Sequence, residues 1–330
     1  MGLALYGPNG FYTSGGSAGR SRGDFITSPE VGPLFGAVLA RALDHWWHEL
    51  GRPEEFVVVD AGAGPGTLAR AVISARPECA DALRYVAVEV AAAQREAHPA
   101  GIESLAEMPR ERFTGVIIAN ELLDNLPFRL FVMDGGWREA CVLEQRDGSF
   151  AEILRPAADL ELLGLPAIAP HGSRVPVQQA ACRWVEAARG SLTAGRVVII
   201  DYALPTTAAF ANRPWRDWLR TYRGHDRGDH YLRNAGLQDI TADVALDQIV
   251  AAVGSPDAVR TQSQFLQRWG IAELVEQGRQ AWAAAASSPT LASITMRSRV
   301  RESDALLADG GLGAFNVMEY AIHGSTRPTL

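Results

Sequence analysis

An uninterrupted apolar run that ends in a glycine-rich turn constrains the fold more than any other feature of this chain. The run covers residues 56–60 (Phe-Val-Val-Val-Asp), and Gly62, Gly64 and Gly66 follow it before a helix expected over 67–74. A strand without polar alternation is typical of a parallel sheet covered on both faces. Glycines at a strand-to-helix turn let a ligand approach the main-chain N–H groups where the helix begins. The segment therefore predicts a βα unit with a binding site at its turn.

Strands and helices continue to alternate after this unit. Alternation at this spacing implies βαβ units, so we expect a doubly wound, mostly parallel, Rossmann-like α/β sheet. The further strands are expected over 85–89, near Ile102, over 115–119 and over 196–202, with helices from Ala91 and over 179–189.

Four segments are expected along the chain. Residues 1–23, rich in glycine and serine, are predicted to be a flexible N-terminus with little to bury. Residues 24–127 are expected to hold a cap helix that begins at Ser28 and the first half of the core. Residues 128–190 are predicted to form a β-meander and helix insertion. The last segment, 191–330, completes the core with a helical insertion over about 203–290 and a closing edge strand over 314–322.

Composition limits which binding partners and which cellular compartment we expect for this chain. A net charge of -7 argues against a sequence-independent grip on phosphate backbones, so no nucleic-acid partner is expected. No apolar run approaches the ~20 residues that span a bilayer, so no membrane partner is expected. The three cysteines form no C-x-x-C pair and no secretory signal is evident, which predicts a cytoplasmic location. His45 and His48 lack a third ligand, so no metal site is expected.

The spacing of the glycines indicates the cofactor. Thr67 stands where a dinucleotide fingerprint has its last glycine, and the resulting Gly-x-Gly-x-Gly form is typical of S-adenosyl-L-methionine sites. Glu89, at the tip of the second strand, is suited to accept both ribose hydroxyls of a nucleoside. The alternatives are a structural turn, a helix-capping role for Glu89, and NAD, which these two features alone do not separate from S-adenosyl-L-methionine.

Acidic and amide side chains follow the fourth strand. In open α/β sheets ligands bind outside the carboxyl ends of the strands, so Asn120, Glu121 and Asp124 are expected to face the reactive centre. Glu121 and Asp124 are three apart, which puts two carboxylates on one side of a helical turn. Such a pair can hold a guanidinium by bidentate hydrogen bonds and bias which nitrogen attacks. The alternative is that these acids cap the next helix.

With these motifs, the chain resembles the MidA-like family of class I methyltransferases, whose mitochondrial members are assembly factors for respiratory complex I. The resemblance runs nearly full length. Its most specific blocks are residues 23–30 and 120–127, because ordinary methyltransferases lack the two together. The other matching blocks are residues 34–36, 66–68, 136–139, 200–202, 239–244, 262–266 and 313–315.

The resemblance implies a class I methyltransferase domain with a family-specific insertion, S-adenosyl-L-methionine as cofactor, and a protein substrate. In mitochondrial members the activity is symmetric dimethylation of a protein arginine. Carried over by position, Gly62, Gly64 and Gly66 would contact the cofactor, while Glu121 and Asp124 would lie near the acceptor. An N-terminal segment that closes over the site would include Asp24, Thr27 and Ser28.

Three places depart from the family's pattern. Asp60-Ala61 stands where Glu-Leu is usual, and Pro65 stands where a basic residue is common. Asp60 preserves the acid with a shorter reach, so it remains a cofactor-binding candidate. Asn125 replaces a usual alanine beside the acceptor site, which bears on the substrate more than on the fold.

The leading hypothesis is a protein arginine N-methyltransferase in which Glu121 and Asp124, with Asn120, orient and polarise the acceptor guanidinium. Because an arginine has a pKa above ~12, the enzyme must help to remove a proton as the new bond forms. The rivals are a non-catalytic assembly or interaction factor that binds the cofactor, an NAD-dependent oxidoreductase, and a methyltransferase of small molecules. The missing third glycine counts against the oxidoreductase, and a closed pocket would favour the small-molecule enzyme.

Overall fold

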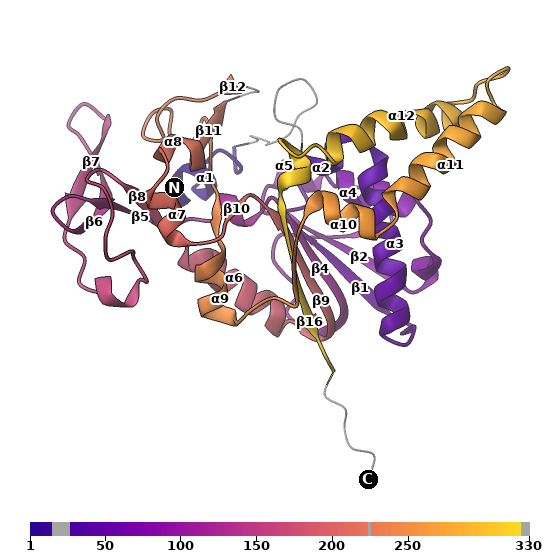
Figure 1. Cartoon of the computed structure of the whole chain (residues 1–330), viewed down its shortest axis with the longest axis horizontal. Coiled ribbons are helices and arrows are strands. Elements are labelled where there is room, and N and C mark those ends of the chain that lie inside the picture. Colours follow the sequence, from indigo (N-terminus) through magenta and orange to yellow (C-terminus); the bar gives the residue numbers. More distant parts are fainter. Residues whose placement is uncertain (15–26, 224–225, 325–330) are drawn as a thin grey trace, which may run out of the picture.

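The computed structural model describes residues 1–14, 27–223 and 226–324 (Figure 1). Within these residues, the central sheet has seven strands. Six of them run in the same direction, and only β16 runs antiparallel to both of its neighbours. The expected doubly wound, mostly parallel sheet is therefore confirmed. The strand order is β3 (Glu103–Leu105), β2 (Leu83–Val88), β1 (Phe56–Ala61), β4 (Phe113–Asn120), β9 (Leu192–Asp201), β16 (Asn316–Ile322) and β15 (Ala258–Thr261).

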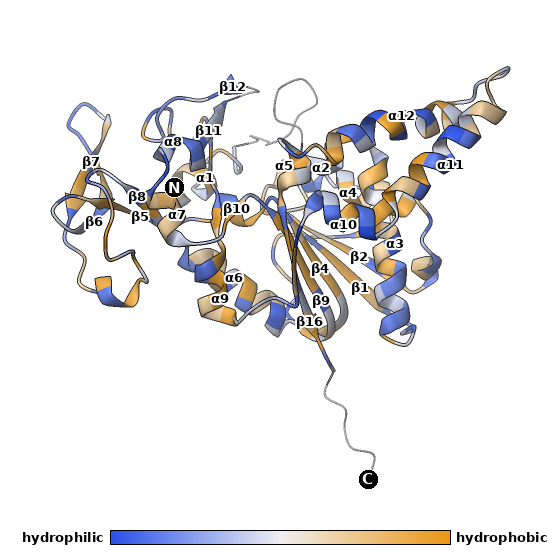
Figure 2. Ribbon diagram, in the orientation of Figure 1, coloured by the Kyte–Doolittle hydropathy of each residue, from blue (hydrophilic) through white to orange (hydrophobic). Residues whose placement is uncertain are grey.

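Alternate side chains of the central strands are buried on opposite faces of the sheet. In β1, Phe56 and Val58 pack into one core, whereas Val57 and Val59 pack into the other. Figure 2 shows these central strands as the most continuously apolar part of the molecule. Helices cover both faces, as a parallel sheet requires. The first face is covered by α3 (Pro33–Glu49), α4 (Thr67–Ser74) and α10 (Gln262–Arg268), and the second by α6 (Gln179–Gly190) and α9 (Leu246–Val253).

A third hydrophobic core joins the elements outside the central sheet and its covering helices. These accessory elements lie on the left of Figure 1. The fully buried members of this core include Leu5, Phe131 and Trp218, which come from three distant parts of the sequence. The predicted meander is present, and a fourth strand, β8, extends it. The four-stranded accessory sheet has the order β7 (Phe150–Arg155), β6 (Trp137–Glu144), β5 (Arg129–Met133) and β8 (Arg174–Val177). A three-stranded accessory sheet has the order β12 (Asp226–Arg227), β11 (Leu219–Arg223) and β13 (Asp239–Ala242).

The N-terminal part differs from its prediction in two ways. The prediction that the N-terminus is loose is wrong for residues 1–14, because α1 (Gly2–Tyr6) inserts the fully buried Leu5 into the third core. The cap helix is broken into α2 (Ser28–Val31) and α3. Gly32 causes the break by adopting a φ of +155°, and the carboxylate of the buried Glu302 then accepts the N–H of Leu34 at 2.8 Å.

The insertion after β9 is less helical than predicted. Strands β11 and β13 pair antiparallel within it, and the two-residue strands β10 (Ala203–Leu204) and β14 (Val244–Ala245) pair beside them. Polar residues of β11 and β13, such as Thr221 and Thr241, are buried. The sequence of these strands therefore shows no alternation of apolar and polar residues. The short helices α7 (Thr207–Ala211) and α8 (Trp215–Trp218) precede β11. The closing strand β16 is not an edge strand, because β15 pairs along its outer side.

Helices α11 (Ile271–Ala284) and α12 (Leu291–Leu306) pack against each other and extend to the upper right of Figure 1. Figure 2 shows both as mixtures of polar and apolar residues. Among the residues described, no helix has the length and apolar character needed to cross a bilayer.

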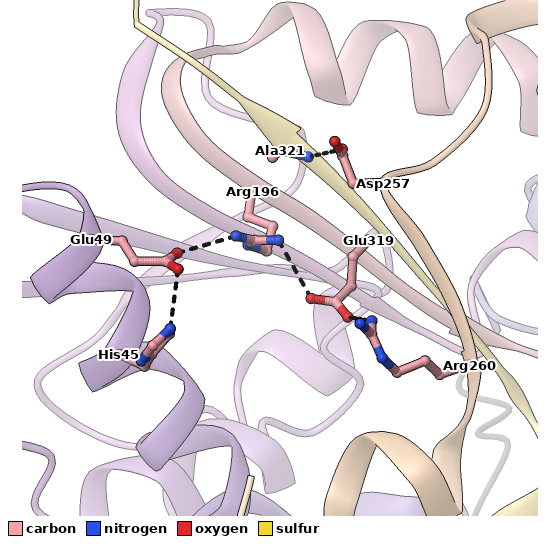
Figure 3. A network of polar contacts seen from close by, with 7 residues as sticks. All are labelled: His45, Glu49, Arg196, Asp257, Arg260, Glu319 and Ala321. Atoms are coloured by element: carbon pink, nitrogen blue, oxygen red, sulfur yellow. Dashed lines mark hydrogen bonds and ion pairs between the residues drawn. The ribbon is translucent and has the colours of Figure 1, made fainter. Parts of the chain in front are cut away.

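A polar network ties the outer strands of the sheet to α3 (Figure 3). Glu319, buried in β16, pairs with Arg196 of β9 at 3.5 Å and with Arg260 of β15. Arg196 also contacts Glu49 of α3 at 3.1 Å, and His45 lies 3.0 Å from the other oxygen of Glu49. One buried carboxylate is thus held between two guanidinium groups from neighbouring strands.

Candidate active site

The carboxyl ends of β2, β1 and β4 lie side by side. The parallel register pairs Ala61 of β1 with Val88 of β2 and with Ala119 of β4, so the residues after these strands meet at one edge of the sheet. The winding reverses between β1 and β4, and ligands of open α/β sheets bind at such a point. A cavity of about 430 Å³ lies there. All the predicted site residues except Gly66 line it: Asp60, Gly62, Gly64, Glu89, Asn120, Glu121 and Asp124.

The glycine turn presents main chain to this cavity. Gly64 has a φ of +53°, and no atom lies within 4 Å of the place where its Cβ would be. A ligand can therefore approach the main chain there. Gly66 has a different function: it is the N-cap of α4, and a Cβ at this position would come within 3.0 Å of Pro99 and 3.2 Å of His98. Gly66 thus permits local packing and does not reach the cavity.

Glu89 and Asp60 flank the turn from β2 and β1. The carboxylate of Glu89 accepts the N–H of Gly64 at 3.0 Å and the N–H of Ala91 at 2.8 Å, which fixes its position. Asp60 accepts the hydroxyl of Tyr85 at 3.1 Å, and burial raises the pKa of its carboxyl group to about 7. Both acids are less than a tenth exposed. They can still accept further hydrogen bonds, because each carboxylate oxygen has two lone pairs.

Glu121 occupies an unusual place just after β4. Its φ is +52°, in the left-handed region that few glutamates adopt, and its N–H donates to Ile200 at 2.8 Å. The amide of Asn120 donates to its carboxylate at 3.1 Å. Burial, with a smaller contribution from the charge of Asp124, raises the pKa of Glu121 to about 8. The side chain is therefore a carboxyl group that binds a proton near neutral pH.

Asp124 lies on the short 3₁₀ turn η2 (Leu123–Asn125), and its side chain is 4% exposed. The hydroxyl of Thr241 donates to its Oδ2, whereas its Oδ1 has no hydrogen-bond partner. Burial raises the pKa of this carboxyl group to about 6, although the Thr241 bond and the charge of Arg220 oppose the shift. The turn itself is held by the buried Asp201, which accepts the N–H of Leu123 at 2.9 Å.

Acidic side chains dominate the charge of the cavity. Three buried acceptor atoms, the Oε2 of Glu30 and the Oδ1 atoms of Asn120 and Asp124, have no hydrogen-bond partner. The described lining contains no lysine, arginine or histidine. Unpaired buried acceptors are costly, so this arrangement favours a ligand that brings several N–H donors and positive charge. The carboxyl side chains of the lining are those of Glu30, Asp60, Glu89, Glu107, Glu121, Asp124 and Asp239.

Several lining residues were not predicted from the sequence. Tyr6 and Tyr12 come from the N-terminal segment that was expected to be loose, and Asp239 and Thr241 come from β13. The last two lie in a block that resembles the MidA-like family, but no local motif assigns them a role. Of the residues expected to close over the site, Thr27 lines the cavity, Ser28 is buried against Gln262 at 2.8 Å, and Asp24 lies outside the described residues.

Asn125, the departure beside the acceptor site, has a structural partner. Its amide donates to Asp239 and to the main-chain oxygen of Ile240, each at 3.1 Å. The side chain is 8% exposed and connects η2 to β13. The asparagine thus joins the central sheet to the accessory sheet at the wall of the cavity.

Comparison with known families decides the class of protein. Residues 38–263 match a family model described as "Putative S-adenosyl-L-methionine-dependent methyltransferase". The chain belongs to this methyltransferase family. The membership confirms the expected class and the expected cofactor, and it agrees with the resemblance to MidA-like proteins.

A solved structure supports the same assignment for the whole methyltransferase fold. A Burkholderia thailandensis protein, crystallised with S-adenosyl-homocysteine, is 28% identical with a TM-score of 0.80, and the match covers 97% of this chain and 86% of that one. The cavity described above therefore belongs to a fold shared with a protein that binds the product form of the cofactor.

Curated relatives carry a more specific name. A Caenorhabditis elegans protein, "Protein arginine methyltransferase NDUFAF7 homolog, mitochondrial", is 26% identical over 76% of this chain and 66% of its own length. The Drosophila melanogaster protein of the same name is 44% identical over 64 residues, which are 19% of this chain and 14% of that protein. The chain thus spans at most about two thirds of the first of these relatives.

The predicted cytoplasmic location is contradicted, because these relatives of the methyltransferase are named as mitochondrial proteins. Unpaired cysteines fit any reducing compartment and so do not identify which one. The histidines that were set aside as metal ligands pair with glutamates: His48 lies 3.0 Å from Glu78, as His45 does from Glu49. Within the part of the chain that the structure describes, no cluster of metal-ligating side chains is present.

Proposed function

We propose that this chain transfers a methyl group from S-adenosyl-L-methionine to the guanidinium group of an arginine in a protein. The observation that carries the proposal is the charge of the cavity, which has seven carboxyl side chains and no basic group in its described lining. The sulfonium of the cofactor and the guanidinium of the acceptor are both cations. The names of the curated relatives support the same acceptor.

The two sides of the cavity suit the two reactants. We assign the main chain at Gly62 and Gly64, with Glu89 and Asp60, to the cofactor, because these residues surround the turn at the end of β1. We assign Glu121 and Asp124 to the acceptor. A guanidinium has five N–H donors, enough for the unpaired oxygen of Asp124 and for the carboxylate of Glu121 together.

The assigned residues account for the chemistry of transfer. A guanidinium nitrogen attacks the methyl carbon, the carbon–sulfur bond breaks, and the cofactor leaves as a neutral thioether. One proton must leave the acceptor as the nitrogen–carbon bond forms. Glu121 is the group that accepts it, because a carboxylate whose pKa is raised to about 8 is a stronger base than an ordinary one. Asp124 and Asn120 hold the acceptor in line with the sulfonium.

The test uses the purified chain, methyl-labelled S-adenosyl-L-methionine, and a soluble protein extract. Label should appear on a polypeptide, and fragmentation by mass spectrometry should locate it on an arginine side chain. Glu121→Gln should lower kcat about 100-fold, since general-base catalysis contributes about that much. Its Kd for S-adenosyl-homocysteine should stay within about twofold of wild type, because the base acts on the acceptor.

Glu144→Gln is the matched control, because Glu144 is an exposed glutamate of β6, outside the cavity. This variant should keep wild-type turnover. Label that appears only on small molecules would overturn the protein acceptor, and label on a residue other than arginine would overturn the guanidinium acceptor. If Glu121→Gln abolished cofactor binding together with turnover, the carboxylate would have a structural role and its assignment as base would be wrong.

A further inference from the structure

Two tyrosines of the N-terminal segment form part of the cavity wall. The rings of Tyr6 and Tyr12 are stacked, with centroids 5.5 Å apart and planes at 19°. Both residues are half-buried and both line the cavity. The pair therefore offers the ligand a flat, electron-rich surface in addition to the acids.

Hydrogen bonds fix this pair against the acidic side of the site. The hydroxyl of Tyr12 donates to Asp239 at 3.0 Å, and the hydroxyl of Tyr6 donates to the main-chain oxygen of Asn125 at 3.2 Å. Asn125 is next to Asp124 in the chain, and its amide also donates to Asp239. The tyrosines are thus attached to the acceptor side of the cavity, and the glycine turn lies on the cofactor side.

From this arrangement we infer that the N-terminal segment completes the acceptor subsite: Tyr6 and Tyr12 pack against the guanidinium-bearing side chain whose nitrogens reach Asp124 and Glu121. This inference rests on the proposed arginine acceptor and adds the surface that selects it. Guanidinium planes stack on aromatic rings, and the contact gains strength where water is excluded. A lysine ammonium would lack the planar stacking and the bidentate fork.

A second observation points to a ligand at the same place. Asp124 is only 4% exposed, and the hydroxyl of Thr241 donates to its Oδ2. Its Oδ1 is buried and has no hydrogen-bond partner. A buried acceptor without a hydrogen-bond partner therefore lies in a residue that lines the acceptor side of the cavity. A planar cation against the tyrosine pair would provide the missing donor.

The test measures binding of arginine amide, as a small acceptor probe, to the full chain saturated with S-adenosyl-homocysteine. Wild type should bind arginine amide more tightly than citrulline amide, which has nearly the same shape but no charge. Tyr6→Leu should weaken arginine amide binding about tenfold, which is the size of a partly desolvated cation–π contact. Tyr6→Phe keeps the ring and should bind within about threefold of wild type.

The preference for arginine amide over citrulline amide, measured in wild type and in the tyrosine variants, separates the possible outcomes. If wild type bound citrulline amide as well as arginine amide, the guanidinium acceptor itself would be wrong, and this inference would be overturned with it. If arginine were preferred but Tyr6→Leu and Tyr12→Leu bound it as wild type does, only the role of the tyrosines would be wrong. Unchanged affinity for S-adenosyl-homocysteine in each variant shows that the fold is intact.

A labelled wild-type protein provides a readout that needs no disruptive substitution. With 3-fluorotyrosine incorporated, the ¹⁹F resonance that is missing in Tyr6→Phe belongs to Tyr6. Arginine amide should shift that resonance in the presence of S-adenosyl-homocysteine, and citrulline amide should shift it less. A Tyr6 resonance that does not move at saturating arginine amide would overturn the inference.

Discussion

Glu121 combines a left-handed backbone with a carboxyl group whose pKa is raised to about 8. A positive φ costs a residue with a side chain about 1 kcal/mol. Such conformations persist mainly where surrounding structure over-determines them, and they cluster at active sites. The N–H bond to Ile200 and the amide of Asn120 hold this one in place. The strain and the shifted pKa both fit a residue selected for reactivity.

The raised pKa of Glu121 predicts how activity depends on pH. In the free enzyme the carboxyl is protonated below about pH 8, so kcat/KM should rise about tenfold per pH unit up to that point and then level off. The effect on stability has the opposite sign. Because the folded pKa lies above the ordinary value of 4.5, the contribution of this group to the free energy of unfolding decreases as pH rises from about 4.5 to about 8.

The measurements are kcat/KM from pH 6 to 9 and urea unfolding over the same range, for wild type and Glu121→Gln. The glutamine variant should lose the ionisation near pH 8 from both profiles. A rate profile that kept this ionisation in the variant would assign it to another group, and the base would have to be sought among the other acids of the cavity.

Gly64 allows a second prediction at the level of a single residue. Gly64→Val should weaken S-adenosyl-homocysteine binding at least about 100-fold, because the branched side chain would enter the open space where the ligand approaches the main chain. Gly101→Val is the matched control: Gly101 also has a positive φ, +90°, and open surroundings, but it lies outside the cavity lining. Calorimetry should show the loss only for Gly64. Equal losses in both variants would mean that backbone strain alone explains the effect.

At the scale of elements, local patterns explain what the sequence predicted. The apolar run of β1, its glycine turn and the block after β4 are each continuous in sequence, and the pairing of parallel strands brings their ends together by rule. The positions of Asp60, Glu89 and Glu121 could therefore be predicted. Strand β13 could not, because its polar residues are buried through hydrogen bonds with distant partners, as Thr241 is with Asp124. A pattern of apolar periodicity contains no signal for such a strand.

The network around Glu319 predicts the stability of the outer strands (Figure 3). Glu319→Gln should lower the free energy of unfolding by about 3 kcal/mol, because it leaves Arg196 and Arg260 without their shared charge in a mostly buried place. Glu276→Gln on α11 is the control, since it removes an exposed pair with Arg279 and should leave stability unchanged within error. Urea unfolding followed by circular dichroism measures both. Equal stability of the two variants would mean that the network contributes nothing.

At the scale of the whole molecule, the cavity lies where separately built parts meet. The two cores of the central sheet contain no residue from the first fourteen, whereas the third core contains Leu5. The helix that holds Leu5 in this core also bears Tyr6, which faces the cavity. The glycine and serine content of residues 1–23 predicted a loose end because it reports average composition. A single leucine and two tyrosines instead determine where residues 1–14 pack.

Because the tyrosines are held by the third core and the cofactor side by the central sheet, a substitution in the third core should weaken acceptor binding and leave cofactor binding unchanged. Leu5→Ala should lower the free energy of unfolding by about 2–4 kcal/mol, because it leaves a cavity in the third core beneath Tyr6. Leu3→Ala, on the same helix but 85% exposed, should change the free energy of unfolding by less than about 0.5 kcal/mol.

S-adenosyl-homocysteine should bind both variants as it binds wild type, since its assigned contacts lie on the central sheet. Arginine amide should bind Leu5→Ala more weakly than Leu3→Ala, because only the first substitution frees the tyrosine wall. Equal binding of arginine amide by the two variants would show that the N-terminal helix is a stabilising element without influence on the site.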